Sequence, residues 1–75
     1  MSKVPRITGE EAVRAFGRAG FALDRISGSH HILKRKGHPL RLSIPVHRGK
    51  NVGKGLLASQ IEAAGLTLDE FLELL

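Results

Sequence analysis

The sequence contains no cysteine among its 75 residues. This absence excludes disulfide bonds, thiolate catalysis and cysteine-bound zinc, and it gives no sign of an oxidising compartment. No apolar run approaches the roughly 18 residues that a membrane-spanning helix needs, and the first residues are too few and too polar for a signal peptide. We therefore expect a soluble cytoplasmic protein with no membrane partner, in which residues 1–75 form a single domain and residues 1–6 an N-terminal tail.

Aromatic side chains are also scarce. There is no Trp or Tyr, and the three Phe residues fall within apolar patterns typical of a core. A stacking platform for single-stranded bases uses exposed aromatic rings, so we do not expect one here. Recognition of a nucleic acid through phosphate and 2′-hydroxyl contacts fits this composition better.

Acidic residues are few outside the C-terminal part. Residues 1–55 hold all 12 Lys and Arg residues against three acids, whereas residues 56–75 hold four acids and no base. The asymmetry favours a basic working surface beside an acidic C-terminal segment. The alternative is a solubilising surface whose charges cluster by chance.

Two capping boxes and the spacing of apolar residues predict helices. Thr8 with Glu11, and Thr67 with Glu70, have the spacing of a capping box at a helix start. Gly20 and Gly65 stand where a helix commonly ends. Together with apolar residues at helical spacing, these signals predict helices at about residues 9–19, 55–64 and 68–74.

Three strands are predicted between the first two helices, over residues 21–27, 30–36 and 40–47. The third has the clearest alternation, with Leu40, Leu42, Ile44 and Val46 on one face. Pro45 cannot donate a ladder hydrogen bond, so we expect it at a sheet edge or strand end. The order α-β-β-β-α with a short C-terminal helix predicts an α+β fold. In it, helices cover one face of an antiparallel sheet, as in double-stranded-RNA-binding domains.

The segment Gly28-Ser29-His30-His31 places two histidines at the start of the second strand. Imidazole titrates near pH 6.5, so a histidine can accept and donate protons close to neutrality. Neighbours on a strand face opposite sides of a sheet, which makes this pair a poor metal chelate. The alternation of the strand does not decide which histidine faces the working surface, and a structural or surface role is the alternative for each.

Basic residues surround this segment in the sequence. Lys34 and Arg35 follow on the same strand, and the glycine-rich segment 47–55 adds His47, Lys50 and Lys54 before a helix. RNA cleavage needs a base for the 2′-hydroxyl proton, an acid for the 5′-oxygen and a cation for the charge on phosphorus. One or two histidines with lysine or arginine suffice, without a metal ion. A flexible, solvated loop is the alternative for residues 47–55.

Three segments occur in order: Gly28-Ser29-His30-His31, Pro45-Val46-His47, and Lys54-Gly55 before a helix that ends Ala63-Ala64-Gly65-Leu66. In this combination the chain resembles, over nearly its whole length, the HicA toxins, which are mRNA interferases of type II toxin–antitoxin systems. The resemblance implies a fold like that of double-stranded-RNA-binding domains, ribosome-independent cleavage of mRNA and neutralisation by a HicB antitoxin. It also implies that His31 is the catalytic histidine and that His47 occupies a recurrent family position of less certain role.

The leading hypothesis is a metal-independent endoribonuclease toxin without a cofactor, in which His31 is the general acid/base and His47 a possible helper. Gly28 would position His31, and the residues expected to bind RNA phosphate are Ser29, Lys34, Arg35, Lys50 and Lys54. We expect a monomer when free and an acidic HicB-like antitoxin over the surface around His31. The alternatives are a non-catalytic RNA-binding module of the same fold and a protein that only occupies its antitoxin.

Overall fold

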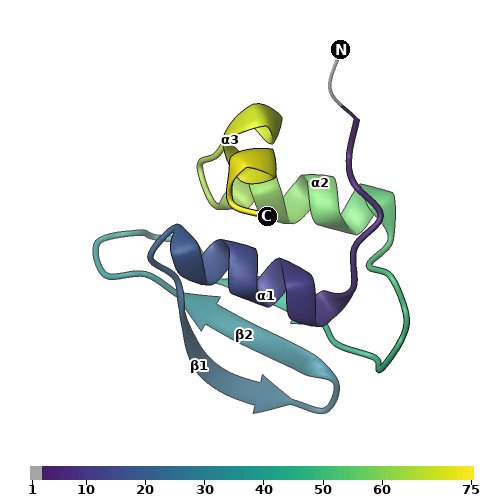
Figure 1. Cartoon of the computed structure of the whole chain (residues 1–75). Coiled ribbons are helices and arrows are strands. Elements are labelled where there is room, and N and C mark those ends of the chain that lie inside the picture. The colour runs from purple at the N-terminus through teal and green to yellow at the C-terminus, as the bar shows by residue number, and fades with distance from the viewer. Residues whose placement is uncertain (1–2) are drawn as a thin grey trace.

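A computed structural model describes residues 3–75 as three strands with helices before and after them (Figure 1). The elements follow in the order α1 (Gly9–Arg18), β1 (Ala22–Ser27), β2 (His30–Lys34), β3 (Leu42–Pro45), α2 (Lys54–Ala63) and α3 (Leu68–Glu73). The predicted α+β fold and element order are confirmed. Within the described residues, no helix combines the length and apolar character needed to cross a bilayer.

The strands form one antiparallel sheet in the order β1-β2-β3. Pro45 is the last residue of β3, an edge strand, as the lack of an N–H donor predicts. The second and third strands are shorter than expected, because residues 35–41 form a connection in which the His38 N–H donates to the Arg35 carbonyl. The prediction that Leu40 belongs to the third strand and shares the face of Leu42 and Ile44 is wrong, since Leu40 precedes β3 and is 53% exposed.

Both predicted capping boxes are present. The Thr8 hydroxyl accepts from the Glu11 backbone N–H, and the Glu11 carboxylate accepts from the Thr8 backbone N–H. Thr67 and Glu70 repeat this arrangement at the start of α3. The hydrogen bonds from the backbone and then the hydroxyl of Thr8 lower the pKa of the Glu11 carboxyl. The cap at Thr8 therefore fixes the start of α1, and the cap at Thr67 fixes the start of α3.

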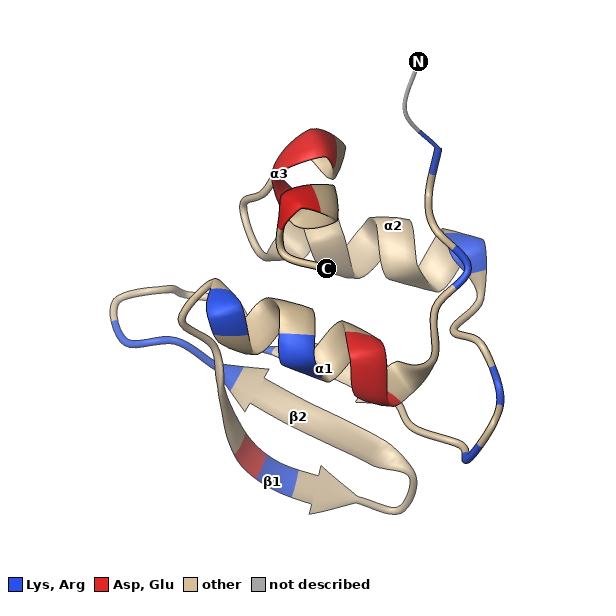
Figure 2. Cartoon of the chain, viewed as in Figure 1, with Lys and Arg blue, Asp and Glu red and all other residues tan. Residues whose placement is uncertain are grey.

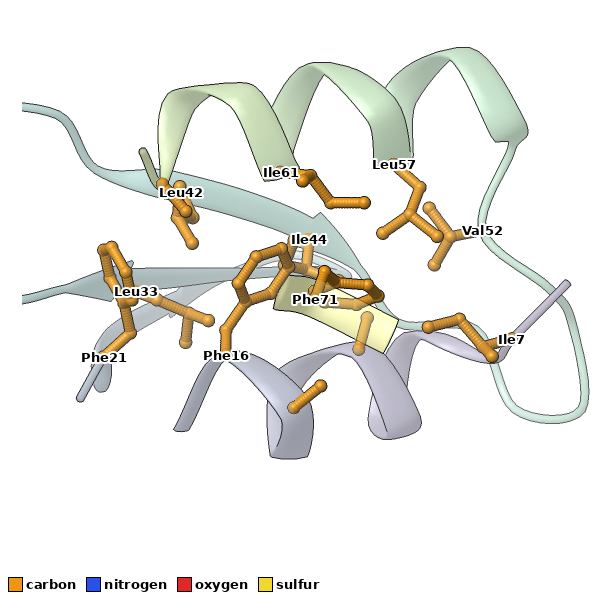
Figure 3. Close-up of a cluster of buried hydrophobic side chains, with 13 residues drawn as sticks. Ile7, Phe16, Phe21, Leu33, Leu42, Ile44, Val52, Leu57, Ile61 and Phe71 are labelled. Atoms are coloured by element: carbon orange, nitrogen blue, oxygen red, sulfur yellow. The ribbon is translucent and has the colours of Figure 1, made fainter. Parts of the chain in front are cut away.

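The core lies between the helices and one face of the sheet (Figure 3). The Phe16 and Phe71 ring centroids lie 4.9 Å apart, and Phe21 meets Phe16 edge-on at 6.2 Å. Strands and helices contribute the remaining large buried side chains, among them Leu33, Leu42, Ile44, Leu57 and Ile61. Burying each such side chain stabilises the fold by about 1.5–3 kcal/mol. The phenylalanines therefore hold the short α3 onto the domain, as their apolar patterns predict.

The outer strand β1 is covered least. A register shift between Leu23 and Arg25 puts Leu23 opposite Leu33 and Ile26 opposite His31. Leu33 is buried by the helices, yet Leu23 and Ile26 remain 50% and 55% exposed. The helices therefore cover β2 and β3 and leave the apolar side chains of β1 at the rim.

Candidate active site

His31 lies on the face of the sheet that the helices cover. It shares this face with Leu33, two residues along β2, and with its cross-strand partner Ile44, and both of these are buried. His30 lies on the opposite face, between Ser27 and Pro45, and is exposed. The two histidines thus face opposite sides, and packing decides what strand alternation left open.

A shallow pocket of about 220 Å³ opens at His31. Its other lining residues are Glu10, Val13 and Arg14 from α1 and Val46 after β3. Glu10 and Arg14 are one helical turn apart and exposed, so they place a carboxylate and a guanidinium at the rim of the pocket. The half-buried imidazole therefore shares this pocket with one acid and one cation.

One nitrogen of the His31 ring is isolated. Nδ1 is the single buried side-chain nitrogen or oxygen, among residues 3–75, that has no hydrogen-bond partner. Buried polar atoms are nearly always paired, and exceptions often mark a functional group. The tautomer of a histidine is usually fixed by the hydrogen bond of its second nitrogen, and here that bond is absent.

The start of α1 is pressed against the end of β3. A Cβ atom on Gly9, the first residue of α1, would lie 2.4 Å from the Pro45 carbonyl oxygen and 2.8 Å from the Val46 Cα. Only glycine permits this approach, and Thr8 caps the helix at this point. The contact places the first turns of α1 over His31.

The loop after β3 lies at the same end of the sheet. The Val46 N–H donates to the Ser29 carbonyl at 2.7 Å, so the chain leaves β3 beside the turn that precedes His31. Gly28, in that turn, has a φ of +59°. The loop then returns to the segment before α1, where the Val52 N–H donates to the Ile7 carbonyl at 2.8 Å. His47 and Lys50 are exposed along this loop, and Lys54 begins α2.

Lys34 and Arg35 lie elsewhere. Lys34 is the last residue of β2 and Arg35 follows it, three and four residues beyond His31, which amounts to about 10–13 Å at ~3.3 Å per residue. The Lys34 ammonium pairs with the Asp24 carboxylate at 3.4 Å, and Arg35 Nη1 donates to the Ala19 carbonyl at 3.1 Å. Figure 2 accordingly shows basic residues at both ends of the sheet. The predicted phosphate-binding set is thus divided into two groups.

Arg14 and Glu10 are the site residues that sequence reasoning missed. Both lie on the exposed part of α1, where a charged side chain ordinarily indicates only solvation. The sequence around Glu10 and Arg14 carries no signal that they lie near His31, because this proximity depends on how α1 crosses β2. Within residues 3–75, no three His, Cys, Asp or Glu side chains are grouped so that they could hold a metal ion.

Comparison with known proteins gives a family match. A family model described as the HicA toxin of bacterial toxin–antitoxin matches residues 9–66 of the 75. The matched range begins at Gly9 and includes both His31 and the loop after β3. No curated protein matches the chain.

Proposed function

Because the chain belongs to the HicA toxin family, and is thus the toxin of a toxin–antitoxin system, we propose that it is a metal-independent endoribonuclease acting on mRNA through His31. One observation carries this proposal. Nδ1 of His31 is buried and unpartnered, while the ring lines an open pocket together with Arg14. A histidine whose Nδ1 has no hydrogen-bond partner, and which lines an open pocket together with a guanidinium, is suited to proton transfer.

The chemistry follows from these groups. The His31 imidazole accepts the proton of the 2′-hydroxyl as its oxygen attacks the adjacent phosphorus. The new P–O2′ bond forms while the P–O5′ bond breaks, and the departing 5′-oxygen takes a proton from an imidazolium, for which His47 is the candidate helper. The products are a 2′,3′-cyclic phosphate and a 5′-hydroxyl. The Arg14 guanidinium stabilises the negative charge that builds on the phosphoryl oxygens.

Further residues are proposed to hold the RNA. Gly28 and Ser29 form the turn that positions His31, and the Ser29 hydroxyl lies in that turn as a donor for phosphate. Lys50 and Lys54 extend the positive charge on the same side. Lys34 and Arg35 act at a distance from the cleaved bond, because they lie at the other end of β2. Charged contacts of this kind position the RNA backbone without reading its sequence.

Adjacent histidines supply a matched pair of variants for the test. We expect His31→Ala to lower the cleavage rate of labelled RNA by about 10²-fold or more, since general acid–base catalysis contributes about 10²–10⁴-fold. His30→Ala, on the opposite face, serves as the control and should cleave within about threefold of the wild type. RNA binding, measured by fluorescence anisotropy, should change little in either variant.

The outcome separates the candidate functions. Equal cleavage by both variants would remove His31 from the chemistry, and RNA binding without cleavage by the wild type would indicate a non-catalytic RNA-binding module. Fragments that carry a 5′-phosphate would contradict attack by the 2′-hydroxyl. Induced expression in cells, followed by growth and RNA integrity, extends the same comparison to toxicity.

We further propose that an acidic HicB-like antitoxin neutralises the toxin by covering the His31 pocket. The pocket rim carries Arg14, and the exposed Ile26 is the cross-strand neighbour of His31. A partner that buries an apolar side chain and pairs the guanidinium would close access to the imidazole. Arg14→Glu should weaken antitoxin binding in a titration with the purified partner, whereas Arg25→Glu, on the other face of β1, should not. Equal loss in both variants would contradict this location.

A further inference from the structure

A second, larger pocket lies at the far end of the sheet from His31. It has a volume of about 520 Å³ and is lined by four cationic side chains, by His38 and by the glycine after α1: Lys34, Arg35, Lys36, Arg41, His38 and Gly20. We call it the basic pocket. Figure 2 shows this basic end of the β2–β3 connection opposite the basic loop that precedes α2. Arg35 follows the last residue of β2 and is about 13 Å from His31 along the extended chain, at ~3.3 Å per residue.

The guanidinium of Arg35 is held in place. Nη1 donates to the Ala19 carbonyl at 3.1 Å, Nη2 lies 3.3 Å from His38 Nδ1, and the group stacks 4.8 Å above the Phe21 ring. A Cβ on Gly20 would approach the Arg35 Cδ to 3.1 Å, so glycine makes room for this side chain. Two of five N–H groups are used, and the remaining donors are oriented in advance.

His38 holds the Arg35 side chain from the other side and joins it to α2. Its Nε2 lies 2.7 Å from the Ala63 carbonyl at the end of α2, and its ring meets Phe21 edge-on at 5.3 Å. Because Nε2 needs a hydrogen to donate to that carbonyl, Nδ1 is left to accept from Arg35. The connection between β2 and β3 is therefore fixed to α2, and the basic pocket is preformed.

The charge of the basic pocket is only partly neutralised. Asp24 is the carboxylate that faces it, with ion pairs to Lys34 at 3.4 Å and to Arg41 at 3.1 Å. No carboxylate of residues 3–75 lies within ion-pair distance of Arg35 or Lys36. Four cations against one acid leave a surplus of positive charge in a concave surface, which attracts anions.

We propose that the basic pocket binds a backbone phosphate of the RNA several nucleotides away from the bond cleaved at His31. The proposal rests on the proposed function in taking RNA as the substrate. A preset arginine fork matches the oxygens of a phosphate, and lysines add charge without strict geometry. The three phenylalanines are buried, so the surface offers phosphate contacts rather than stacking on these rings.

The consequence is a dependence on RNA length. An RNA too short to reach from His31 to the basic pocket gains nothing from it, whereas a longer RNA gains a second anchor on the same molecule. The anchor contributes to binding and leaves the reacting groups unchanged. It therefore lowers KM for long RNA and has little effect on kcat.

The test uses Lys36→Gln with Arg41→Gln, because both side chains are exposed. Arg35 is left intact, since its hydrogen bonds support the fold. The matched control is Lys3→Gln with Arg6→Gln, which removes the same charge from exposed residues before α1. Lys36→Gln alone preserves the pair between Arg41 and Asp24, and thermal unfolding of all variants confirms the fold.

The substrates are a trinucleotide and an RNA of about sixteen nucleotides, which is the upper site size of a single-strand-binding OB fold. For the longer RNA, we expect the pocket variant to raise KM about tenfold with kcat unchanged, as for the loss of charge-assisted hydrogen bonds. For the trinucleotide, kcat/KM should stay within about twofold, as should all values of the control. Binding of the longer RNA in a His31→Ala background should lose about 0.7 from the salt slope for each phosphate contact removed.

The outcomes distinguish the two proposals. Loss of affinity that is equal for both RNA lengths, or equal to that of the control, overturns the basic pocket as an RNA site while leaving cleavage at His31 intact. Loss of antitoxin binding with unchanged RNA affinity also overturns it, because the ligand is then a protein. If the wild type fails to cleave but the pocket variant loses affinity for long RNA, the proposed nuclease fails and the phosphate site stands. Failure of the His31→Ala protein to bind the longer RNA overturns the pocket.

Discussion

Gly9 offers a direct test of how α1 is placed over His31. Substitution by alanine adds a Cβ that would lie 2.4 Å from the Pro45 carbonyl oxygen and 2.8 Å from the Val46 Cα. Both are backbone atoms, so neither moves aside by a rotamer change. The start of α1 has to shift away from the end of β3, and Val46 lines the His31 pocket. The substitution therefore perturbs both stability and the site.

The magnitude follows from the contact. Overpacking a tight site costs about 1–3 kcal/mol. Gly17 is the matched control, because it lies within α1, is exposed, and has nothing within 4 Å of an added Cβ. Gly17→Ala should stabilise the protein by about 0.5–1 kcal/mol, since glycine inside a helix costs that much relative to alanine. The same chemical change is thus expected to have opposite signs at two positions of one helix.

Thermal unfolding followed by circular dichroism measures both effects. At roughly 4–8 °C per kcal/mol for a domain of this size, Gly9→Ala should lower Tm by about 4 °C or more, and Gly17→Ala should raise it by about 2–8 °C. At a temperature where both variants are folded, only Gly9→Ala should lower RNA cleavage. A Gly9→Ala protein as stable and as active as Gly17→Ala would refute the close contact between α1 and β3.

Three further predictions concern stability and charge. Burial raises the pKa of Asp24, but Lys34 and Arg41 together outweigh it and hold that pKa below its usual value. The two ion pairs therefore stabilise the fold above the usual pKa, and this contribution is lost as the pH falls through the lower folded pKa; Asp24→Asn should flatten acid unfolding in this range and tighten RNA binding. His38→Ala leaves the Ala63 carbonyl without its donor and should lower the free energy of unfolding in urea by about 1–3 kcal/mol, without a change in kcat. An unchanged urea midpoint would count against a role for His38 in fixing the β2–β3 connection to α2. Phe71→Ala should cost about 3–5 kcal/mol and release α3, and full protection of α3 amides from hydrogen exchange in that variant would contradict its anchoring role.

The candidate site could be predicted only in part. The turn Gly28-Ser29 and the two histidines are visible in the sequence, and the resemblance favoured His31. The alternation of β2 alone could not favour either histidine, because both faces of the strand carry apolar and basic residues. The roles of the site residues stay predictions, yet their placement is now known: Lys50 lies near the His31 end, and Arg35 belongs to a different pocket.

The sequence by itself determined the features that depend on local signals. Capping boxes, helix-ending glycines, the apolar spacing and the position of Pro45 act over a few residues, so the element order and the α+β fold follow from them. The family also follows from the sequence, since the family model matches residues 9–66.

Only the tertiary structure decided which groups meet. Arg14 lines the same pocket as His31 because α1 crosses β2, and the four cations of the basic pocket converge because the β2–β3 connection folds back on α2 through His38. Leu40 is exposed although its pattern matches a buried strand residue, because the hydrogen-bonded connection before β3 removes it from the sheet. Such contacts join residues far apart in the chain, and their geometry depends on packing of the whole core, which no local pattern encodes.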